Sequence, residues 1–340
     1  MKKTLKSLLS SFAPLAISAV LALFPVLLTS CSVKPTQKVT FAMGSVVSQT
    51  VYGGDGGAAE KANKAIAELD GLISYRDEDS EIAKLNKDKT AFLSDNVLKL
   101  VRESLELSSD TAGMFDITVL PLVKVWGFDG DSPALPAEEE ISSALESVGF
   151  ENIIINESSV TLKNSAALDL SALGKGLACE AAVNEYKKAG ATGGIVSVGG
   201  SVGVYGLKTG GKPFTVGIRD PFDVSSVIGT LTITNTFIST SGSYEKKFEK
   251  DGKTYHHLLD PKTGYPAYGG CVSVTVVCGD GGLSDALASA CFCLGIEKSQ
   301  TLLEKYSAEA VFITDGNKIF ITSGLTGVFE TPLGYEAAYR

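Results

Sequence analysis

The chain contains two histidines, and they stand side by side in the segment His256-His257-Leu-Leu-Asp260-Pro-Lys-Thr-Gly264. A histidine with a pKa near 6.5 can take a proton from a hydroxyl nucleophile at neutral pH. The segment is expected to be the end of a strand followed by a turn, and neighbouring residues of a strand point to opposite faces, so at most one histidine can face a given cavity. The alternative is one histidine in the core and one on the surface.

Asp285 and Ser289 stand four residues apart, which places a carboxylate and a hydroxyl on one face of a helix. Two hard oxygen ligands in this arrangement suit magnesium, which keeps water and substrate phosphates at its other positions. The alternative is that Asp285, or Ser284, is the N-cap of a helix that ends at Gly295.

The segment 169–176, Asp-Leu-Ser-Ala-Leu-Gly-Lys-Gly, is expected to connect a short strand at 168–170 to a helix. Backbone N–H groups at a helix start, with glycines that allow close approach and Lys175 beside them, can hold a phosphate. Asp169 stands where a Walker A loop needs its first glycine, so the segment is not that motif. The alternative is a tight turn with a solvated lysine.

Aromatic side chains stand close to carboxylates at two further places in the sequence. Phe115 and Asp116 follow a glycine and lead toward Trp126, the one tryptophan of the chain, and Tyr75 precedes the acidic stretch 77–81. Such pairs are compatible with contacts to an adenine edge or a flavin ring. They are equally compatible with packed loops.

The elements that must position these residues follow from hydrophobic periodicity and turn signals. Apolar residues at helical spacing predict helices over 58–73, from about 97 to 113 and from 136 to 149. Further helices are predicted at about 175–189, 285–294 and 297–305. Segments rich in β-branched residues predict strands at 39–51, 195–198, 201–205, 215–219, 227–234 and 272–277. Hairpins are predicted at 152–163 and at 245–259. Hairpins dominate the second half of the chain, which favours an α+β fold.

Composition narrows the classes of function. The chain has 340 residues and a net charge of −9, so it lacks the excess of cations that binding to nucleic acid requires. Apart from Cys31 there are five cysteines, an odd number, so at least one does not pair within the chain. Cys291 and Cys293 lack the second pair that a zinc site needs.

The N-terminus is typical of an export signal. Residues 1–30 begin with lysines, continue with an apolar run at 15–28, and end in Leu-Thr-Ser directly before Cys31. A cysteine in this position resembles a bacterial lipobox, where the thiol is acylated after cleavage. We therefore expect a signal peptide at 1–30, a lipidated tether at 31–38 and a catalytic domain at 39–340. The protein would be extracytoplasmic and anchored to the bacterial membrane at Cys31. The alternative is an uncleaved membrane anchor.

The motifs occur in one order along the chain, and that order resembles the ApbE flavin-transferase family. The resemblance extends from about residue 39 to 330, and His-x-x-Asp-Pro-x-Thr-Gly at 257–264 is its most specific part. The matching segments are 43–45, 80–86, 113–118 with 121–122 and 126–128, 169–176, 199–200, 240–242 with 244, 257–264 and 285–289.

This resemblance implies a T-fold-like α+β architecture, with mixed and antiparallel sheets and packed helices. It implies the activity of an FAD:protein FMN transferase, which moves FMN from FAD to a Thr or Ser hydroxyl of an acceptor protein and releases AMP. The acceptors would be membrane redox-pump subunits of the Nqr and Rnf type. The resemblance also implies Mg²⁺ as cofactor and FAD as substrate.

The resemblance assigns roles to individual residues. His257 and Lys175 would be catalytic, His257 by deprotonating or orienting the acceptor hydroxyl. Magnesium would be held by Asp285, Ser289 and the carbonyl of Gly174. The residues expected to bind FAD are Met43, Tyr75, Met114, Phe115, Asp116, Ser171, Lys175, Leu177 and Leu258.

The chain departs from the family pattern at three positions. Ser289 replaces the usual Thr and keeps the hydroxyl, and Gly174 replaces a common Ala. Ser243 stands where the family often has Asp, which predicts slower turnover if that Asp assists the metal or the base. Two other functions remain open: an FAD pyrophosphatase that releases FMN and AMP, and a non-catalytic flavin-binding or solute-binding lipoprotein.

Overall fold

The computed structural model describes residues 34–130 and 132–337. Its largest element is a nine-stranded sheet with the order β1-β2-β6-β7-β10-β13-β14-β15-β17. Neighbouring strands are antiparallel except β15 and β17, which are parallel. The strands are β1 (Thr36–Ala42), β2 (Ser45–Gly53), β6 (Ala191–Val198), β7 (Ser201–Gly206), β10 (Thr236–Gly242), β13 (Cys271–Cys278), β14 (Glu309–Thr314), β15 (Ile319–Ile321) and β17 (Glu336–Ala337).

Three small sheets surround the large one. Their orders are β16-β9-β8, β3-β5-β4 and β11-β12. The strands are β3 (Thr90–Phe92), β4 (Ile153–Asn156), β5 (Ser159–Leu162), β8 (Phe214–Arg219), β9 (Val227–Ile233), β11 (Lys247–Lys250), β12 (Lys253–His256) and β16 (Phe329–Glu330).

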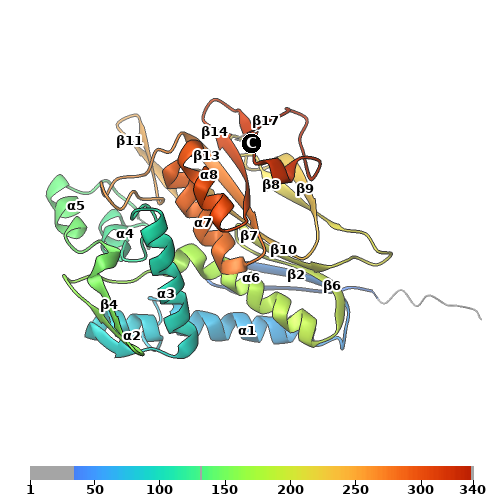
Figure 1. The fold of residues 1–340 in the computed structure, drawn as a ribbon, viewed down its shortest axis with the longest axis horizontal. Coiled ribbons are helices and arrows are strands. Elements are labelled where there is room, and N and C mark those ends of the chain that lie inside the picture. The colour runs from blue at the N-terminus through green and yellow to red at the C-terminus, as the bar shows by residue number, and fades with distance from the viewer. Residues whose placement is uncertain (1–33, 131, 338–340) are drawn as a thin grey trace, which may run out of the picture. The chain divides into compact units, whose positions relative to one another are not determined.

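Some of the helices cover one face of the large sheet, and the β16-β9-β8 sheet covers part of the other. The helices are α1 (Ala58–Ile73), α2 (Glu81–Asp88), α3 (Asp95–Asp110), α4 (Leu120–Trp126), α5 (Glu138–Leu145), α6 (Ser171–Lys188), α7 (Gly281–Leu294) and α8 (Ile296–Lys305), with 3₁₀ turns at Phe150–Asn152 and Ser323–Leu325. Figure 1 shows α1 and α6 side by side, with α7 beside α6.

Alternation along the strands explains the two layers. Val47 and Val51 of β2 pack with Ile66 of α1 on the helix face of the sheet. Phe237 of β10 belongs to the same cluster, whereas its neighbour Ile238 packs on the opposite face with β8 and β9. Each fully buried aliphatic side chain contributes about 1.5–3 kcal/mol relative to an exposed one. The strand pairing and the packed layers confirm the predicted α+β fold class with mainly antiparallel sheets.

Several predicted boundaries are corrected by the structure. The strand expected at 39–51 is two strands, with a turn at Met43 and Gly44. Because β1 begins at Thr36, the last residues of the predicted tether belong to the fold. Predicted hairpins at 152–163 and 245–259 are present.

The largest correction concerns the segment that was expected to be a phosphate-holding loop. Helix α6 begins at Ser171 and not near Lys175, and residues 168–170 do not form a strand. Gly174, Lys175 and Gly176 therefore lie within the first two turns of the helix.

The N-terminal predictions, including lipidation at Cys31, fall outside the described residues. Among the described residues, no helix combines the length and apolar character needed to cross a membrane. The cysteine thiols of residues 34–130 and 132–337 are all free: Cys179, Cys271, Cys278, Cys291 and Cys293.

Candidate active site

One cavity collects residues from distant parts of the chain. It lies where the starts of α4 and α6 meet α7, the end of β10 and the segment after β12. Most of the predicted site residues line it: Tyr75, Met114, Phe115, Asp116, Ser171, Lys175, His257, Leu258, Asp285 and Ser289.

A close crossing of α6 and α7 forms one wall of the cavity. A Cβ atom at Gly176 would lie 1.9 Å from the carbonyl oxygen of Gly281, and a Cβ at Gly281 would lie 2.3 Å from that of Gly176. The two backbones touch because neither residue has a side chain. As a result Asp285 reaches α6, and its Oδ2 accepts a hydrogen bond from the Gly176 N–H at 3.0 Å.

The N-cap of α7 is a different residue from the two candidates considered above. Oδ1 of Asp280 accepts from the Leu283 N–H at 2.8 Å. Ser284 donates its hydroxyl to the Gly281 carbonyl, so neither Ser284 nor Asp285 is the cap. Helix capping therefore does not explain why the carboxylate of Asp285 is buried. Burial raises its pKa, and the charge of Lys175 opposes that shift.

Two serine hydroxyls line the same cavity as this carboxylate. Ser289, one helical turn after Asp285, lies with its Oγ 3.0 Å from the Oγ of Ser241 on β10. An acid and two hydroxyls are hard oxygen ligands of the kind that magnesium prefers.

These donors fit a magnesium ion that depends on its substrate for further ligands. No group of three or more His, Cys, Asp or Glu side chains that could hold a metal occurs in the ranges 34–130 and 132–337. Since magnesium usually binds through one or two carboxylates plus phosphates and water, the donor set suits a metal that a diphosphate completes. Gly174, the third predicted ligand, lies within α6 and is buried.

Three cations line the cavity: Lys175, Arg76 and Lys246. The charge of Asp285, and less strongly that of Glu245, raises the pKa of Lys175 against the effect of burial. Burial and the neighbouring cations lower the pKa of Lys246. Four acidic side chains line the same cavity, so the three cations give an anionic ligand local positive partners and not a cavity of net positive charge.

Sequence reasoning missed Arg76, Lys246 and Glu245. Arg76 follows Tyr75, and its guanidinium lies 4.4 Å from the centre of the Tyr75 ring. Glu245 and Lys246 directly follow Tyr244, which belongs to a matching segment. Their position next to these two tyrosines was the feature of the sequence that could have identified them. Ser243, in contrast, does not line the cavity, and its N–H and hydroxyl both donate to the Val272 carbonyl.

The two histidines occupy different environments. His257 follows the last residue of β12 and lines the cavity, with its N–H donating to the Lys246 carbonyl at 3.1 Å. His256 packs edge-on against Phe292 with a ring-centre distance of 5.5 Å. The expectation that only one histidine faces the cavity is confirmed, and the other belongs to the core.

The imidazole of His257 is largely buried and is unprotonated at neutral pH. Its Nδ1 is buried and has no hydrogen-bond partner among the described residues. Burial, followed by the charges of Lys175 and Lys246, lowers the pKa of His257 to about 3. The side chain is therefore a neutral imidazole at neutral pH, which can accept a proton.

A second buried polar atom without a partner is the hydroxyl of Tyr75. Such a group costs free energy unless a ligand or water satisfies it, so it points to a binding function. Asp116 is better satisfied, because its Oδ1 accepts from the N–H and the hydroxyl of Thr118. Trp126 is fully buried, and its indole N–H donates to the Gly264 carbonyl at 2.8 Å. It supports the turn after His257 and does not line the cavity.

Three predicted site residues are not among those that line the cavity. Met43, at the β1–β2 turn, packs over Gly174, where an added Cβ would lie 3.1 Å from the methionine methyl group. Leu177 lies on the other side of α6, where with Leu173 it lines a second cavity between α3, α6 and α7. Helical periodicity explains the split, since positions 171 and 175 share one face and 173 and 177 another.

Comparison with known proteins identifies the family. The sequence model of the ApbE family matches residues 43–312. This chain belongs to the ApbE family. A Klebsiella pneumoniae relative named FAD:protein FMN transferase is 32% identical over 295 residues, which cover 82% of this chain and 84% of the relative. An Escherichia coli K12 protein of the same name is 30% identical over 279 residues, covering 78% and 80%.

Solved structures of ApbE proteins share the fold. The crystal structure of the ApbE protein from Thermotoga maritima superposes with a TM-score of 0.81 at 29% identity, covering 87% of this chain and 99% of that protein. The apo flavinyl transferase ApbE of Pseudomonas stutzeri superposes with a TM-score of 0.76 at 27% identity, covering 87% and 96%. The resemblance inferred from the sequence motifs is therefore confirmed.

Proposed function

We propose that this protein is a magnesium-dependent FAD:protein FMN transferase that moves FMN from FAD to a Thr or Ser hydroxyl of an acceptor protein and releases AMP. One observation carries the proposal: Asp285, Ser289, Lys175 and His257 line a single cavity although they come from separate segments. The names of the curated relatives support the same activity.

The cavity offers suitable groups for each part of FAD. Tyr75 with its unpartnered hydroxyl, together with residues 114–116 and Leu258, would contact the ring systems. The positive end of the α6 dipole, in the first turn at Ser171, would favour a phosphate. The Ser171 N–H itself donates to Oδ1 of Asp169 at 2.8 Å. Lys175 would hold the diphosphate beside that turn. Met43 would act from a distance, by packing over Gly174.

Asp285 and Ser289, with the Gly174 carbonyl, would hold the magnesium ion. When bound, the ion neutralises negative charge that builds on the diphosphate as its P–O bond breaks. Lys175 would add to this effect from the protein, since it lies close to Asp285 and its raised pKa keeps it charged.

His257 would receive the proton of the acceptor. The acceptor hydroxyl oxygen forms a bond to the FMN phosphorus, the bond from that phosphorus to the AMP phosphate oxygen breaks, and AMP leaves as the anion. The hydroxyl proton passes to His257, which is neutral before the reaction. A bound diphosphate offsets the charges of Lys175 and Lys246, so it raises the pKa of His257 from its low value and makes this proton transfer more favourable.

The predicted lipidation at Cys31 indicates where the acceptor would be found. A lipid on Cys31 would keep the enzyme at the outer side of the bacterial membrane, next to membrane-embedded redox-pump subunits of the Nqr and Rnf type. Such subunits are the acceptors that we propose.

The experiment co-incubates the full chain with FAD, MgCl₂ and a purified candidate acceptor subunit. The expected result is flavin fluorescence on the acceptor in a denaturing gel and a mass gain equal to FMN on one Thr or Ser. Asp285→Asn, which keeps the shape of the side chain, is the control without transfer. Release of free FMN and AMP at the same rate with and without acceptor would instead identify a pyrophosphatase. Retention of intact FAD under all conditions would identify a binding protein.

A further inference from the structure

Three apolar side chains are exposed on one face of the β1–β2 hairpin. Val39 is 72% exposed, Phe41 is 71% exposed and Val46 is 58% exposed. Val39 and Phe41 are two residues apart on β1, and Phe41 pairs with Val46 on β2, so all three point to the same side of the sheet. Their grouping distinguishes them from a single exposed apolar residue, which needs no explanation.

This face is left open by the layers that cover the rest of the sheet. The helix face of the hairpin is buried, where Val47 and Val51 pack with α1. On the open face, cover by the β16-β9-β8 sheet begins at Tyr52, whose ring lies 5.9 Å from that of Phe214. The apolar hairpin face, defined as Val39, Phe41 and Val46, therefore lies beyond the edge of that cover.

The distance along the chain from the predicted membrane anchor to this face is short. Since β1 begins at Thr36, Cys31 stands five residues before the first strand. Five residues span at most about 18 Å when fully extended. Both interpretations of the N-terminus lead to the same neighbour. Either a lipid on Cys31 or the apolar run at 15–28 would enter the bilayer just before β1.

We propose that the apolar hairpin face docks onto the surface of the lipid bilayer. The proposal rests on the membrane anchoring that is part of the proposed function. Apolar side chains at a membrane surface gain free energy in proportion to the apolar area that they bury. A short tether raises the effective concentration of that contact, because it confines the domain to the surface.

The start of β2 lies close to the active-site lysine. A Cβ at Gly199 would lie 2.6 Å from the Oγ of Ser45, the first residue of β2, and 3.2 Å from the Cδ of Lys175. The hairpin end and the active-site lysine thus contact the same glycine. Lys175 belongs to α6 on the helix face of the sheet, so docking through the open face confines the domain to the membrane surface without covering the active-site cavity.

The experiment places an environment-sensitive NBD label at position 41 of the full chain, through Phe41→Cys, in vesicles of phosphatidylethanolamine and phosphatidylglycerol. Phe92→Cys is the matched control, because Phe92 is 79% exposed but belongs to the separate β3-β5-β4 sheet. The unsubstituted chain gives the background from native cysteines. We expect a blue-shifted label at position 41 that spin-labelled lipids quench several-fold more strongly than the label at position 92.

Equal and weak quenching at both positions would overturn the proposal. So would a label at position 41 that becomes shielded only when acceptor protein is added, since the face would then bind protein and not lipid. Failure of the chain to associate with the vesicles would also overturn it.

A second variant separates this inference from the proposed function. Phe41→Ser with Val46→Ser should leave FMN transfer in detergent unchanged and slow transfer to an acceptor in vesicles several-fold. Loss of transfer from the unsubstituted chain in detergent would contradict the proposed function alone. Equal transfer rates of variant and unsubstituted chain in vesicles would contradict the docking alone.

Discussion

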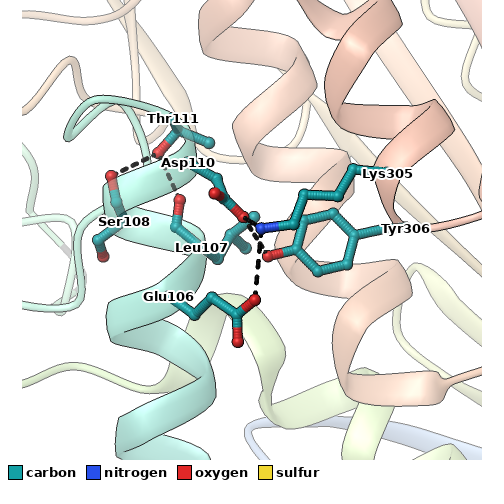
Figure 2. A network of polar contacts seen from close by, with 7 residues as sticks. All are labelled: Glu106, Leu107, Ser108, Asp110, Thr111, Lys305 and Tyr306. Atoms are coloured by element: carbon teal, nitrogen blue, oxygen red, sulfur yellow. Dashed lines mark hydrogen bonds and ion pairs between the residues drawn. The ribbon is translucent and has the colours of Figure 1, made fainter.

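Two regions of the protein contain polar and charged residues of similar types but differ in how these residues are buried and paired. At the contact between α3 and α8, Lys305 binds both Asp110 and Glu106, and the Tyr306 hydroxyl lies 2.6 Å from Asp110 (Figure 2). The charged groups are exposed, Tyr306 is half-buried, and together they satisfy one another.

In the active-site cavity the polar groups are buried and incompletely paired. The Tyr75 hydroxyl and the His257 Nδ1 have no partner within the described ranges, and burial opposes the charge of Asp285. Burying polar groups without partners costs free energy, and a ligand bound in this cavity would offset that cost. The surface cluster contributes to how two helices pack, whereas the cavity is prepared for a partner that carries charge.

The largest expected effect on FMN transfer comes from replacing the cavity residue Asp285 by Asn. The matched comparison is Asp110→Asn in the surface cluster. Asp285→Asn should reduce FMN transfer by about 10²–10³-fold, because the amide is a poorer ligand for the cation that would neutralise the developing negative charge. Its fold should persist, because the Asn side-chain oxygen can still accept from the Gly176 N–H. Asp110→Asn in the surface cluster should leave transfer unchanged. Transfer rates and circular dichroism spectra of the two variants check this pair, and equal activity of both would break the comparison.

The close crossing of α6 and α7 predicts a large effect on stability. Gly176→Ala places a Cβ against the backbone of Gly281 and should destabilise the protein by about 1–3 kcal/mol or more, because neither backbone can move freely. Gly71→Ala is the control, since Gly71 lies in α1 with nothing within 4 Å of an added Cβ. That substitution should stabilise by about 0.5–1 kcal/mol. Urea denaturation measures both, and a stable Gly176→Ala variant would exclude the backbone contact.

The buried histidine in the cavity predicts a pH dependence of stability. The pKa of His257 is about 3 in the folded protein and near 6.5 when unfolded. The unfolded state therefore binds more protons between these values, so this group's contribution is fully present above pH 6.5 and is lost as pH falls toward 3.

Comparison of the unsubstituted chain with His257→Gln isolates this contribution from those of the buried acids, whose raised pKa values act in the opposite direction. Between pH 7 and pH 5 the unsubstituted chain should lose roughly 2 kcal/mol more than the variant. Urea denaturation at the two pH values gives the difference, and parallel losses would show that His257 is not buried as a neutral group.

The smallest effect is expected in the surface cluster. Lys305→Met keeps the length of the side chain and removes its charge, and Tyr306 still contacts Asp110. Exposed ion pairs are screened by solvent and salt, so both the urea midpoint and FMN transfer should stay within experimental error of the unsubstituted chain. A clear loss of transfer would show that this cluster communicates with the cavity.

The elements with strong local signals were predictable from the sequence. The helix at 58–73 matches α1 in both bounds, and the hairpin at 152–163 is present. The start of α6 was misjudged because its glycines resemble a loop. Gly176 is instead required by the contact with Gly281, which no local pattern reveals.

The site was predictable only where motifs marked it. His257 and Asp285 stood out by type and spacing, and they line the same cavity. Arg76 and Glu245 have no such spacing, and only the tertiary fold brings them together. Leu177 shows the converse, because it belongs to a matching segment but faces a different cavity.

The central claim is that the diphosphate of FAD lies beside the metal held by Asp285 and Ser289. Phosphorus NMR of FAD bound to the full chain, titrated with Mn²⁺ in place of Mg²⁺, tests it most directly. The account predicts strong paramagnetic broadening of both diphosphate signals with the unsubstituted chain and little broadening with Asp285→Asn at equal occupancy by FAD. Equal broadening in the two proteins would contradict the account.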